Sequence, residues 1–349
     1  MATIVQAGEG PGGLHCEEVA KALRHGFRDR GVTVREMHRL SGGFSRETWL
    51  LRVDWKKSQP LAGTELILRR DATGGIVSTP LRNEFEIYRV LRGSGLPVPT
   101  VYFFGDEGGD LERPYYVMSR CEGEAAPETI TALDVCGRQR LAHQAMETLA
   151  AIHALDAKAV GQAFDGGDGV PRRASEEVAR WAEVFNRAHT DGHPVIAAAL
   201  AWLERNAPAA RGAGVVVHGD FRTGNLLHGP NGDLVAVLDW ELAHRGEPAE
   251  DLGWFCMERW RWSGPDAVGG LVPRKTLLAE YARASGRTVD LDEVGFWELL
   301  GNVKLAAIQA TSASRIHTGV TGRLSLVRSA RFIDHQSLFV VRALLERLR

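Results

Sequence analysis

The sequence predicts an α+β protein of two lobes: an N-terminal antiparallel sheet with one key helix, and a C-terminal lobe that is mostly helical. Three observations predict this plan. Strand-like segments dominate up to about residue 120, and helical periodicity dominates from about Ala132. The chain has 349 residues, enough for two lobes that share one cleft. We therefore expect lobes over residues 1–120 and 121–349.

The N-terminal lobe is expected to hold one early helix, five strands and one helix between them. Helical spacing covers residues 15–30, and strands are expected at 34–40, 48–55, 65–70, 101–104 and 115–119. Thr79 is expected to cap the intervening helix, with Pro80 in its first position. Leu81, Phe85 and Tyr88 then fall on one face of that helix, which predicts that this face is buried.

The C-terminal lobe is expected to be helical apart from three short strands. Helices are expected at residues 137–155, 174–188 and 194–206, and strands at 215–218, 225–228 and 234–239. Helical periodicity then resumes to the C-terminus.

Composition excludes several classes of protein. With 44% hydrophobic and 25% charged residues and a net charge of -2, the chain is typical of a globular enzyme rather than a nucleic-acid binder. We expect no signal peptide in residues 1–13 and no membrane span, since no apolar run approaches about 18 residues. The four cysteines are scattered, which favours a reducing cytoplasm. Oligomeric state is left open.

The strongest functional signal is a pair of loop motifs that follow two short apolar strands. His218-Gly219-Asp220 opens the first, with Asn225 five residues after the aspartate, and Asp239 ends the second. Phosphoryl transfer needs a hydroxyl held in line and cations that screen the phosphates. Asp220 can orient the hydroxyl and accept its proton, so it is the candidate catalytic base. Asn225 and Asp239 offer oxygen ligands for Mg²⁺, so they are the candidate metal ligands.

At these motifs the sequence resembles the aminoglycoside-phosphotransferase-like kinases, and within them the subgroup also found fused to acyl-CoA dehydrogenases. The resemblance covers about residues 34–260, and the segments that carry it keep the same order. They are Leu40-Ser41-Gly42-Gly43-Phe44-Ser45, Leu68-Arg69-Arg70, Val117-Met118-Ser119, His218-Gly219-Asp220-Phe221-Arg222, Gly224-Asn225, Leu238-Asp239-Trp240-Glu241 and Asp251-Leu252-Gly253-Trp254. The resemblance implies a protein-kinase-like fold, ATP and Mg²⁺, a nucleotide-binding N-terminal lobe, and a C-terminal lobe with the catalytic loop and the acceptor pocket.

Carried over to this chain, the loop of Ser41, Gly42, Gly43, Phe44 and Ser45 would cover the phosphates. Glycines let the backbone approach a phosphate closely, and successive N–H groups can form an anion-binding nest. Without the other motifs, the same residues predict only a hairpin turn.

The resemblance also implies that Arg69 contacts phosphate and that Glu84 is its ion-pair partner. Arginine stands where such kinases usually have lysine, although it looks usual for this subgroup. Arginine can clamp phosphate through two donors, with a different reach from lysine. Arg70 is the alternative, because alternation along a strand points only one of the two toward the nucleotide. We favour Arg69.

The adenine contacts implied by the resemblance are the backbone of Ser119 and Cys121, with Ile67 covering the base. Cys121 has no histidine nearby in the sequence, so we do not expect a nucleophile. His153, His218 and Asp251 are expected to be structural residues rather than catalytic ones.

We expect the acceptor to be a small molecule with a hydroxyl. The sequence leaves open which molecule it is and whether the donor is ATP or GTP. Residues 255–349 hold 14 Lys and Arg against 9 Asp and Glu, a net of +5, with Trp260, Trp262 and Trp297 among them; the rest of the chain is at -7. This favours an anionic or neutral hydroxylated acceptor. A hydroxyacyl thioester of coenzyme A is one such molecule, and the subgroup resemblance also suggests it. The alternatives are an aminoglycoside or other antibiotic kinase, which would phosphorylate a polycation, and a nucleotide-binding pseudokinase, which would not need Asp220.

Overall fold

The chain divides into two compact units by the density of its internal contacts. We describe them in a computed structural model covering residues 14–40, 46–56, 63–72, 79–157, 160, 171–189, 192–210, 212–262, 264, 266–320, 327, 329–330 and 332–348. Unit 1 is Met1–Gly93 with Val98–Cys121, and unit 2 is Ser94–Pro97 with Glu122–Arg349.

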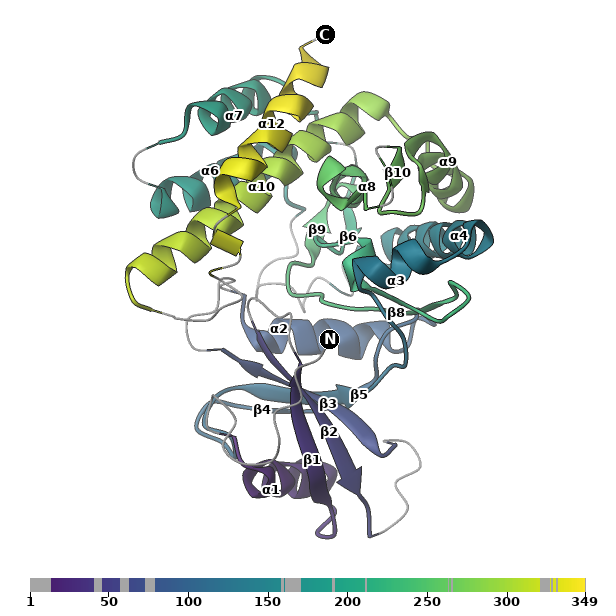
Figure 1. The fold of residues 1–349 in the computed structure, drawn as a ribbon, viewed down its shortest axis with the longest axis vertical. Coiled ribbons are helices and arrows are strands. Elements are labelled where there is room, and N and C mark those ends of the chain that lie inside the picture. Colours follow the sequence, from purple (N-terminus) through teal and green to yellow (C-terminus); the bar gives the residue numbers. More distant parts are fainter. Residues whose placement is uncertain are drawn as a thin grey trace. The chain divides into compact units, whose positions relative to one another are not determined.

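Unit 1 is an antiparallel sheet with a helix on each face (Figure 1). Its elements are α1 (Cys16–Phe27), β1 (Thr33–Leu40), β2 (Arg46–Asp54), β3 (Glu65–Asp71), α2 (Leu81–Leu91), β4 (Val101–Gly105) and β5 (Tyr115–Ser119). The strand order is β1-β2-β3-β5-β4, and every neighbouring pair is antiparallel. The expected five strands and the helix between β3 and β4 are confirmed.

Alternation along β3 sorts its side chains between two faces. Leu66 and Leu68 are fully buried in a core with Leu23 of α1 and Trp49 of β2. Ile67 and Arg69 alternate with these leucines and point to the opposite face, where Arg69 reaches α2. The hydrophobic face expected for α2 is buried as well.

Two helix ends in unit 1 differ from the expected ones by one to three residues. Helix α1 ends at Phe27 rather than at residue 30, because Arg28 adopts a left-handed conformation with φ of 53°. Helix α2 begins at Leu81, and Pro80 is its N-cap rather than its first residue, since the ψ of 137° at Pro80 is extended. Thr79 therefore precedes the cap.

Unit 2 is a set of helices around three small two-stranded sheets (Figure 1). Its helices are α3 (Pro127–Ala132), α4 (Val135–His153), α6 (Ala174–Ala188), α7 (Pro194–Arg205), α8 (Pro248–Cys256), α9 (Arg274–Ser285), α10 (Leu291–His317), α12 (Ile333–Arg347) and the short 3-10 turns η1 (Thr223–Asn225) and η2 (Glu258–Trp260). The long helix α10 packs against α6, α7, α8 and α12, and α4 packs against α9. The helical character expected for this part of the chain is confirmed.

The strands of unit 2 are shorter and more numerous than expected. They are β6 (Val215–Val217), β7 (Leu226–His228), β8 (Leu234–Val237), β9 (His244–Gly246), β10 (Ala267–Val268) and β11 (Val272–Pro273). Asn225 and Asp239 lie just outside the strands that were expected to contain them. Strands β9, β10 and β11 were not expected from the sequence, because strands of two or three residues are too short to alternate recognisably.

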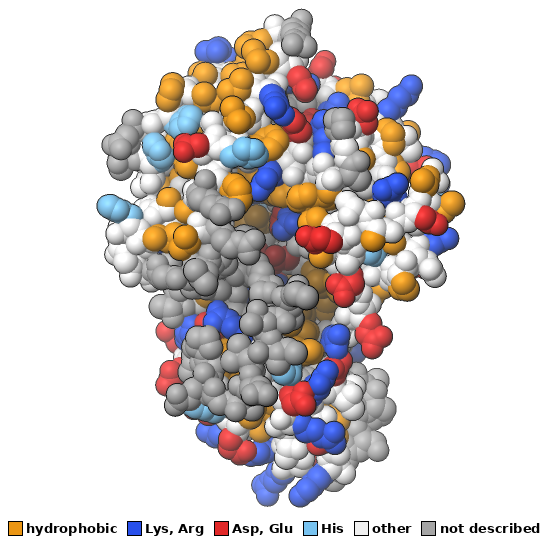
Figure 2. Space-filling view, in the orientation of Figure 1, with side chains coloured by type: hydrophobic (Ala, Val, Ile, Leu, Met, Phe, Trp, Pro, Cys, Tyr) orange, Lys and Arg blue, Asp and Glu red, His pale blue; other side chains and the backbone are white. Residues whose placement is uncertain are grey.

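The described surface carries charges of both signs side by side on the face drawn in Figure 2. Within the part of the chain that the structure describes, no helix combines the length and the apolar character that crossing a bilayer requires.

Candidate active site

The loop from the end of β6 to η1 is the candidate catalytic loop, and it carries Asp220 with both carboxylate oxygens engaged. Oδ2 accepts a hydrogen bond of 2.6 Å from Nδ2 of Asn225. Oδ1 accepts one of 2.8 Å from the indole Nε1 of Trp254 and one of 3.0 Å from Nε of Arg222. Three donors from two parts of the chain therefore fix the orientation of this carboxylate.

Asp251 of α8 holds the backbone just before Asp220. Its Oδ2 accepts from the N–H of His218 at 2.8 Å, and its Oδ1 accepts from the N–H of Gly219 at 2.9 Å. Gly219 has φ of 80°, and a Cβ there would lie 2.5 Å from the carbonyl oxygen of Leu242, so only glycine fits. Burial alone would raise the pKa of Asp251, but its hydrogen bonds, first of all that from His153, hold this pKa below its ordinary value.

Two buried histidines support the same loop, as the sequence analysis expected. The ring of His218 contacts the carbonyl oxygen of Leu238 through Nε2 at 3.0 Å, while its Nδ1 accepts from the N–H of Asp220 at 3.2 Å. Burial lowers the pKa of His218, which fits a neutral ring with its proton on Nε2. His153 joins Asp251 to the hydroxyl of Tyr281 at 3.2 and 2.7 Å. Both rings therefore make the contacts expected of structural residues.

The β7–β8 hairpin brings the two candidate metal ligands to neighbouring positions. Strand β7 follows directly after Asn225, and the N–H of Leu238 donates to the carbonyl oxygen of Asn225 at 2.9 Å. Asp239 comes next, with φ of 67°, a conformation that aspartate tolerates better than most residues and that is enriched at functional sites.

The donor set on this hairpin fits a magnesium ion. The amide nitrogen of Asn225 is turned toward Asp220, so the amide oxygen is the atom left for a cation. With the carboxylate of Asp239 it supplies oxygen ligands only, as Mg²⁺ prefers. We therefore keep both residues as the candidate metal ligands.

In unit 1, Arg69 and Glu84 form a buried ion pair. Nη1 of Arg69 donates to Oε1 of Glu84 at 2.6 Å, and both side chains are almost completely shielded from solvent. Arg70 points to the other face of the sheet, where its guanidinium donates to Oε2 of Glu47 at 2.7 and 3.0 Å. The expected pairing of Arg69 with Glu84 is thus formed, while contact with phosphate stays a prediction.

The candidate adenine contacts lie at the end of β5. The N–H of Ser119 donates to the carbonyl oxygen of Thr100 at 2.8 Å, so this N–H is already used within unit 1. Cys121 follows the strand, and burial raises the pKa of its thiol, which disfavours a nucleophile. Ile67 is 8% exposed on the face of Arg69. The loop of Ser41, Gly42, Gly43, Phe44 and Ser45 lies outside the described residues.

Three residues of the site received no specific role from the sequence. Arg222 and Trp254 lie within recognised motifs but were not expected to hold Asp220. Lys304 lies in no motif, yet its ammonium donates to the carbonyl oxygen of Gly219 at 2.5 Å. Lys304 is the only charged residue in 299–307, and this was the available signal, because a lysine buried in a helix needs a partner.

Comparisons with known proteins show the family to which the chain is similar. A profile described as "Phosphotransferase enzyme family" matches residues 17–297. Among curated proteins, mouse acyl-CoA dehydrogenase family member 10 is 30% identical over 60% of the chain and 20% of its own length. Human acyl-CoA dehydrogenase family member 11 is 26% identical over 88% of the chain and 42% of its own length. The chain thus spans less than half the length of these relatives.

A solved structure shows the same fold. A Ralstonia eutropha protein assigned as an aminoglycoside phosphotransferase superposes with a TM-score of 0.71, covering 94% of this chain and 97% of that one at 19% identity. The resemblance found in the sequence, including the link to acyl-CoA dehydrogenases, is confirmed. Because the profile match spans most of its length, the chain belongs to the phosphotransferase enzyme family.

Proposed function

We propose that this protein is an ATP-dependent small-molecule kinase that transfers the γ-phosphate of ATP to a hydroxyl of its acceptor. The observation that carries this proposal is the arrangement around Asp220. A carboxylate held by three donors adjoins an asparagine and an aspartate suited to Mg²⁺. A protein that only binds nucleotide would not need such a carboxylate, which argues against a pseudokinase.

In the proposed mechanism, Asp220 acts on the acceptor rather than on the nucleotide. Its carboxylate accepts a hydrogen bond from the acceptor hydroxyl, orients it, and takes its proton as the new O–P bond forms. Asn225 and Asp239 would hold Mg²⁺, which screens the charge of the phosphates.

For the nucleotide we propose contacts from unit 1. Arg69, held by Glu84, would contact phosphate, since a guanidinium carries five N–H donors in a planar fork that suits phosphate oxygens. Ile67 would cover the base, and the backbone of Ser119 and Cys121 would meet its edge. The backbone group of Ser119 that would contact the base is its carbonyl, because its N–H already donates to Thr100. The loop of residues 41–45 would cover the phosphates.

For the acceptor we propose an anionic or neutral hydroxylated molecule, such as a hydroxyacyl thioester of coenzyme A. Arg222 supports this, because its guanidinium contacts Asp220 and lies 5.1 Å from the centre of the Trp260 ring, beside the atom that would receive the proton. A cation there disfavours an ammonium group and favours a carboxylate or phosphate. The relatives named acyl-CoA dehydrogenases point to the same class.

A second candidate is an antibiotic kinase, which the likeness to an aminoglycoside phosphotransferase favours. This likeness is one of fold. An aminoglycoside carries several ammonium groups, so its pocket is expected to present carboxylates near the base. The positive charge of Arg222 beside Asp220 makes this the weaker candidate.

The proposal is tested with two variants and one control. Asp220→Asn should lower kcat by about 10²- to 10⁴-fold while the affinity for Mg-ATP stays within about threefold, because the base acts on the acceptor. Asp239→Ala should instead abolish Mg²⁺-dependent nucleotide binding in calorimetry. Asp233→Asn, an exposed position in the β7–β8 turn, is the control and should change neither quantity.

The assay measures ADP release with ATP or GTP across a library of metabolites and acyl-CoA compounds. Turnover that Asp220→Asn leaves intact would remove Asp220 from the proposed role. Tight, Mg²⁺-dependent binding of ATP by Asp239→Ala would show that this residue is not a metal ligand.

A further inference from the structure

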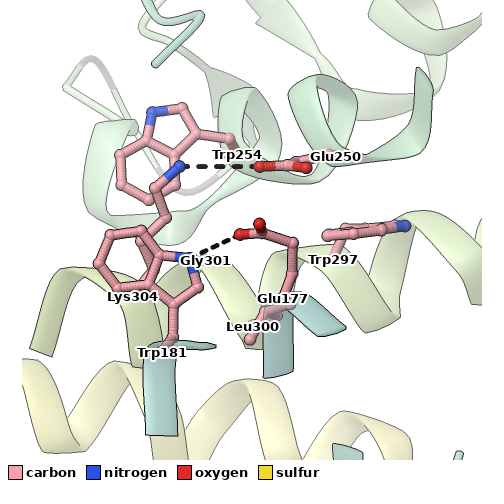
Figure 3. Close-up of a pocket in the computed structure, with 8 residues that line it drawn as sticks. All are labelled: Glu177, Trp181, Glu250, Trp254, Trp297, Leu300, Gly301 and Lys304. Carbon is pink, nitrogen blue, oxygen red and sulfur yellow. Dashed lines mark hydrogen bonds and ion pairs between the residues drawn. The ribbon is translucent and has the colours of Figure 1, made fainter. Parts of the chain in front are cut away.

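Behind the catalytic loop lies a small pocket that no step of the proposed reaction uses (Figure 3). It is lined by Glu177, Trp181, Glu250, Trp254, Trp297, Leu300, Gly301 and Lys304. The cavity measures about 10 Å³, the space of a single water, so an organic acceptor does not fit. Its walls are indole rings and carboxylates, the lining expected of a site for an ammonium group.

The chain supplies that ammonium group itself. The Nζ of Lys304 lies 4.6 Å from the centre of the Trp254 ring and 5.5 Å from that of Trp181. It also lies 3.8 Å from Oε1 of Glu250, as the dashed line in Figure 3 marks. Lys304 is 4% exposed, so its charge is stabilised by these neighbours rather than by bulk water.

The acidic side chains at this pocket already have cationic partners. Glu177, His244 and Glu250 could together ligate a metal ion. However, Nε2 of His244 lies 3.1 Å from Oε2 of Glu250, and Arg172 and Arg180 lie 3.5 and 3.3 Å from Oε1 of Glu177. With the ammonium of Lys304 added, the two carboxylates are balanced by fixed positive groups. A divalent metal ion is therefore disfavoured here, and Lys304 is the resident cation.

Two contacts join this cation to Asp220. Lys304 donates to the carbonyl oxygen of Gly219, the residue directly before Asp220, at 2.5 Å. It also lies against the ring of Trp254, whose indole N–H donates to Oδ1 of Asp220 at 2.8 Å. One ammonium therefore contacts both the backbone and the indole that orient the carboxylate.

We propose that Lys304 and Trp254 are positioning residues for the phosphoryl transfer. The Lys304 ammonium, held between the indole rings and Glu250, fixes Gly219 and Trp254, and Trp254 fixes the Asp220 carboxylate. This inference rests on the proposed function of Asp220. The contact between Lys304 and Trp254 is observed in the structure whatever the function of Asp220 is. We make two predictions from this arrangement. Removing the charge of Lys304 lowers kcat rather than nucleotide affinity, and an external ammonium ion restores kcat to a variant that lacks the Lys304 side chain.

The first experiment measures hydrolysis of Mg-ATP, with water as the acceptor, by Lys304→Met. This variant keeps an unbranched side chain, one heavy atom shorter, and removes the charge. We expect kcat to fall by about 10- to 100-fold while KM for Mg-ATP stays within about threefold. Lys275→Met, an exposed lysine at the start of α9, is the matched control and should behave as the wild type. A kcat for Lys304→Met within about threefold of the wild type would overturn the inference.

Chemical rescue separates a positioning role from a general loss of packing. Lys304→Ala removes three methylene groups and the ammonium, so n-propylammonium is the probe that replaces them. We expect this ion to restore kcat by about tenfold or more in Lys304→Ala and to leave Lys275→Ala unchanged. If Lys304→Ala retains the wild-type unfolding temperature but n-propylammonium does not raise its kcat, the ammonium group does not position the site and the inference is overturned.

A third variant keeps the test decisive if both Lys304 variants fail to fold. Trp254→Phe preserves an aromatic ring beneath the ammonium and removes the N–H that contacts Asp220. Its kcat should fall by about tenfold at unchanged KM for Mg-ATP. Trp202→Phe on α7 is the control and should keep the wild-type kcat. A wild-type kcat for Trp254→Phe would contradict the role of the indole.

A spectroscopic readout does not depend on turnover. The chain has nine tryptophans, so its indole N–H groups give a small set of signals in a nitrogen–proton correlation spectrum. Trp254→Phe and Trp202→Phe assign two of them. In Lys304→Met the Trp254 signal should move and the Trp202 signal should not. If Asp220→Asn hydrolyses Mg-ATP like the wild type, the proposed function fails, but this shift still decides whether Lys304 positions Trp254. An unmoved Trp254 signal overturns the inference.

Discussion

Asp220 meets two requirements of a general base, a fixed orientation and a remaining acceptor site. A carboxylate offers about four lone-pair positions. Asn225, Arg222 and Trp254 use three of them in the structure. Within the described part of the chain, one position therefore remains for the proposed acceptor hydroxyl, and its direction is set by the other three. Removing any of these donors should impair orientation more than nucleotide binding.

Arg69 and Arg70 show how neighbouring residues on one strand divide between two roles. Arg69→Ala should raise KM for Mg-ATP and lower kcat, since it removes the proposed phosphate contact and leaves Glu84 buried without its partner. Arg70→Ala should leave KM within about threefold but lower the free energy of unfolding by about 1–3 kcal/mol, because the buried Glu47 loses its closest cation and keeps the longer contacts to Arg113 and Arg39 at 3.5 and 3.6 Å. Steady-state kinetics and urea unfolding of both variants check this.

The reverse pattern, with KM raised only by Arg70→Ala, would assign the phosphate contact to Arg70. The sequence alone predicted that one of the two arginines faces the nucleotide, because alternation on a strand is a local property. It did not predict that Arg70 pairs with Glu47. From the sequence alone, Arg70→Ala would have been expected to do little. That pairing depends on the register between β2 and β3, where Glu47 lies opposite Arg70, and register is set by the whole sheet.

Helix α8 serves as the brace of the site, because its successive residues face different neighbours. Glu250 and Trp254, four residues apart, both contact Lys304. Asp251 turns to the catalytic loop instead. Gly253 lets α8 approach α10 closely, since a Cβ there would lie 2.6 Å from Cβ of Trp297. One short helix thus connects the long helix α10 to the backbone beside Asp220.

Asp251→Asn should destabilise the protein strongly. The substitution keeps the size of the side chain but places an NH₂ group where an oxygen accepts N–H bonds. At pH 7 we expect the free energy of unfolding to fall by about 3–5 kcal/mol, measured by urea unfolding. Asp134→Asn at the N-cap of α4, where asparagine also caps well, is the control and should change it by about 0.5 kcal/mol or less.

The effect of Asp251→Asn should also depend on pH. The pKa of Asp251 is lowered in the folded protein from its ordinary value of 3.8, so its contribution to stability is complete above that value. It is lost as the pH falls through the folded-state pKa. The difference in unfolding free energy between the wild type and Asp251→Asn should therefore be constant from pH 7 to about pH 5 and shrink below pH 3.8. A difference that grows in acid would contradict the assignment.

Long elements were predictable from the sequence, whereas the short ones that shape the site were not. Helix α6 and strand β5 have the expected bounds, because their periodic patterns extend over enough residues. Strand β9 is three residues long and pairs with β6, which lies about thirty residues earlier. Nothing local indicates that pairing. The sequence also does not predict the positive φ at Asp239, although this φ sets the direction of the chain after β8.

At the scale of the whole molecule, the two contact-based units are close to the two lobes expected on either side of residue 120. One small segment is assigned differently. Residues 94–97 belong to unit 2, although they follow α2 of unit 1. The N–H of Val237 donates to the carbonyl oxygen of Pro97 at 2.8 Å, next to the hairpin that carries Asp239. The proposed lobes of residues 1–120 and 121–349 thus differ from the contact-based units mainly in residues 94–97, and sequence composition does not indicate this difference.

The uneven distribution of charge along the chain predicts the charge of the acceptor. Residues 255–349 carry a net charge of +5 and supply Lys304 and Trp260 to the surroundings of the catalytic loop. Arg222 adds a further cation beside Asp220. The two carboxylates behind the loop, Glu177 and Glu250, already face cations of the chain. A polycationic acceptor would therefore meet positive groups near the base and few unmatched carboxylates.

We accordingly predict that kanamycin is a poor substrate and that overexpression of the protein confers no resistance to it. Hydroxyacyl-CoA compounds should be phosphorylated with a kcat/KM of about 10⁴ M⁻¹s⁻¹ or above, while the value for kanamycin should be at least about 100-fold lower. Both are measured as ADP release, with Asp220→Asn as the blank. Arg222→Gln should reduce turnover of the anionic acceptor, because it removes a positive charge beside the proposed base. The ratio of kcat/KM for hydroxyacyl-CoA to kcat/KM for kanamycin should therefore become smaller. Kanamycin turnover at about 10⁴ M⁻¹s⁻¹ by the wild type would reject the anionic acceptor and favour the antibiotic kinase.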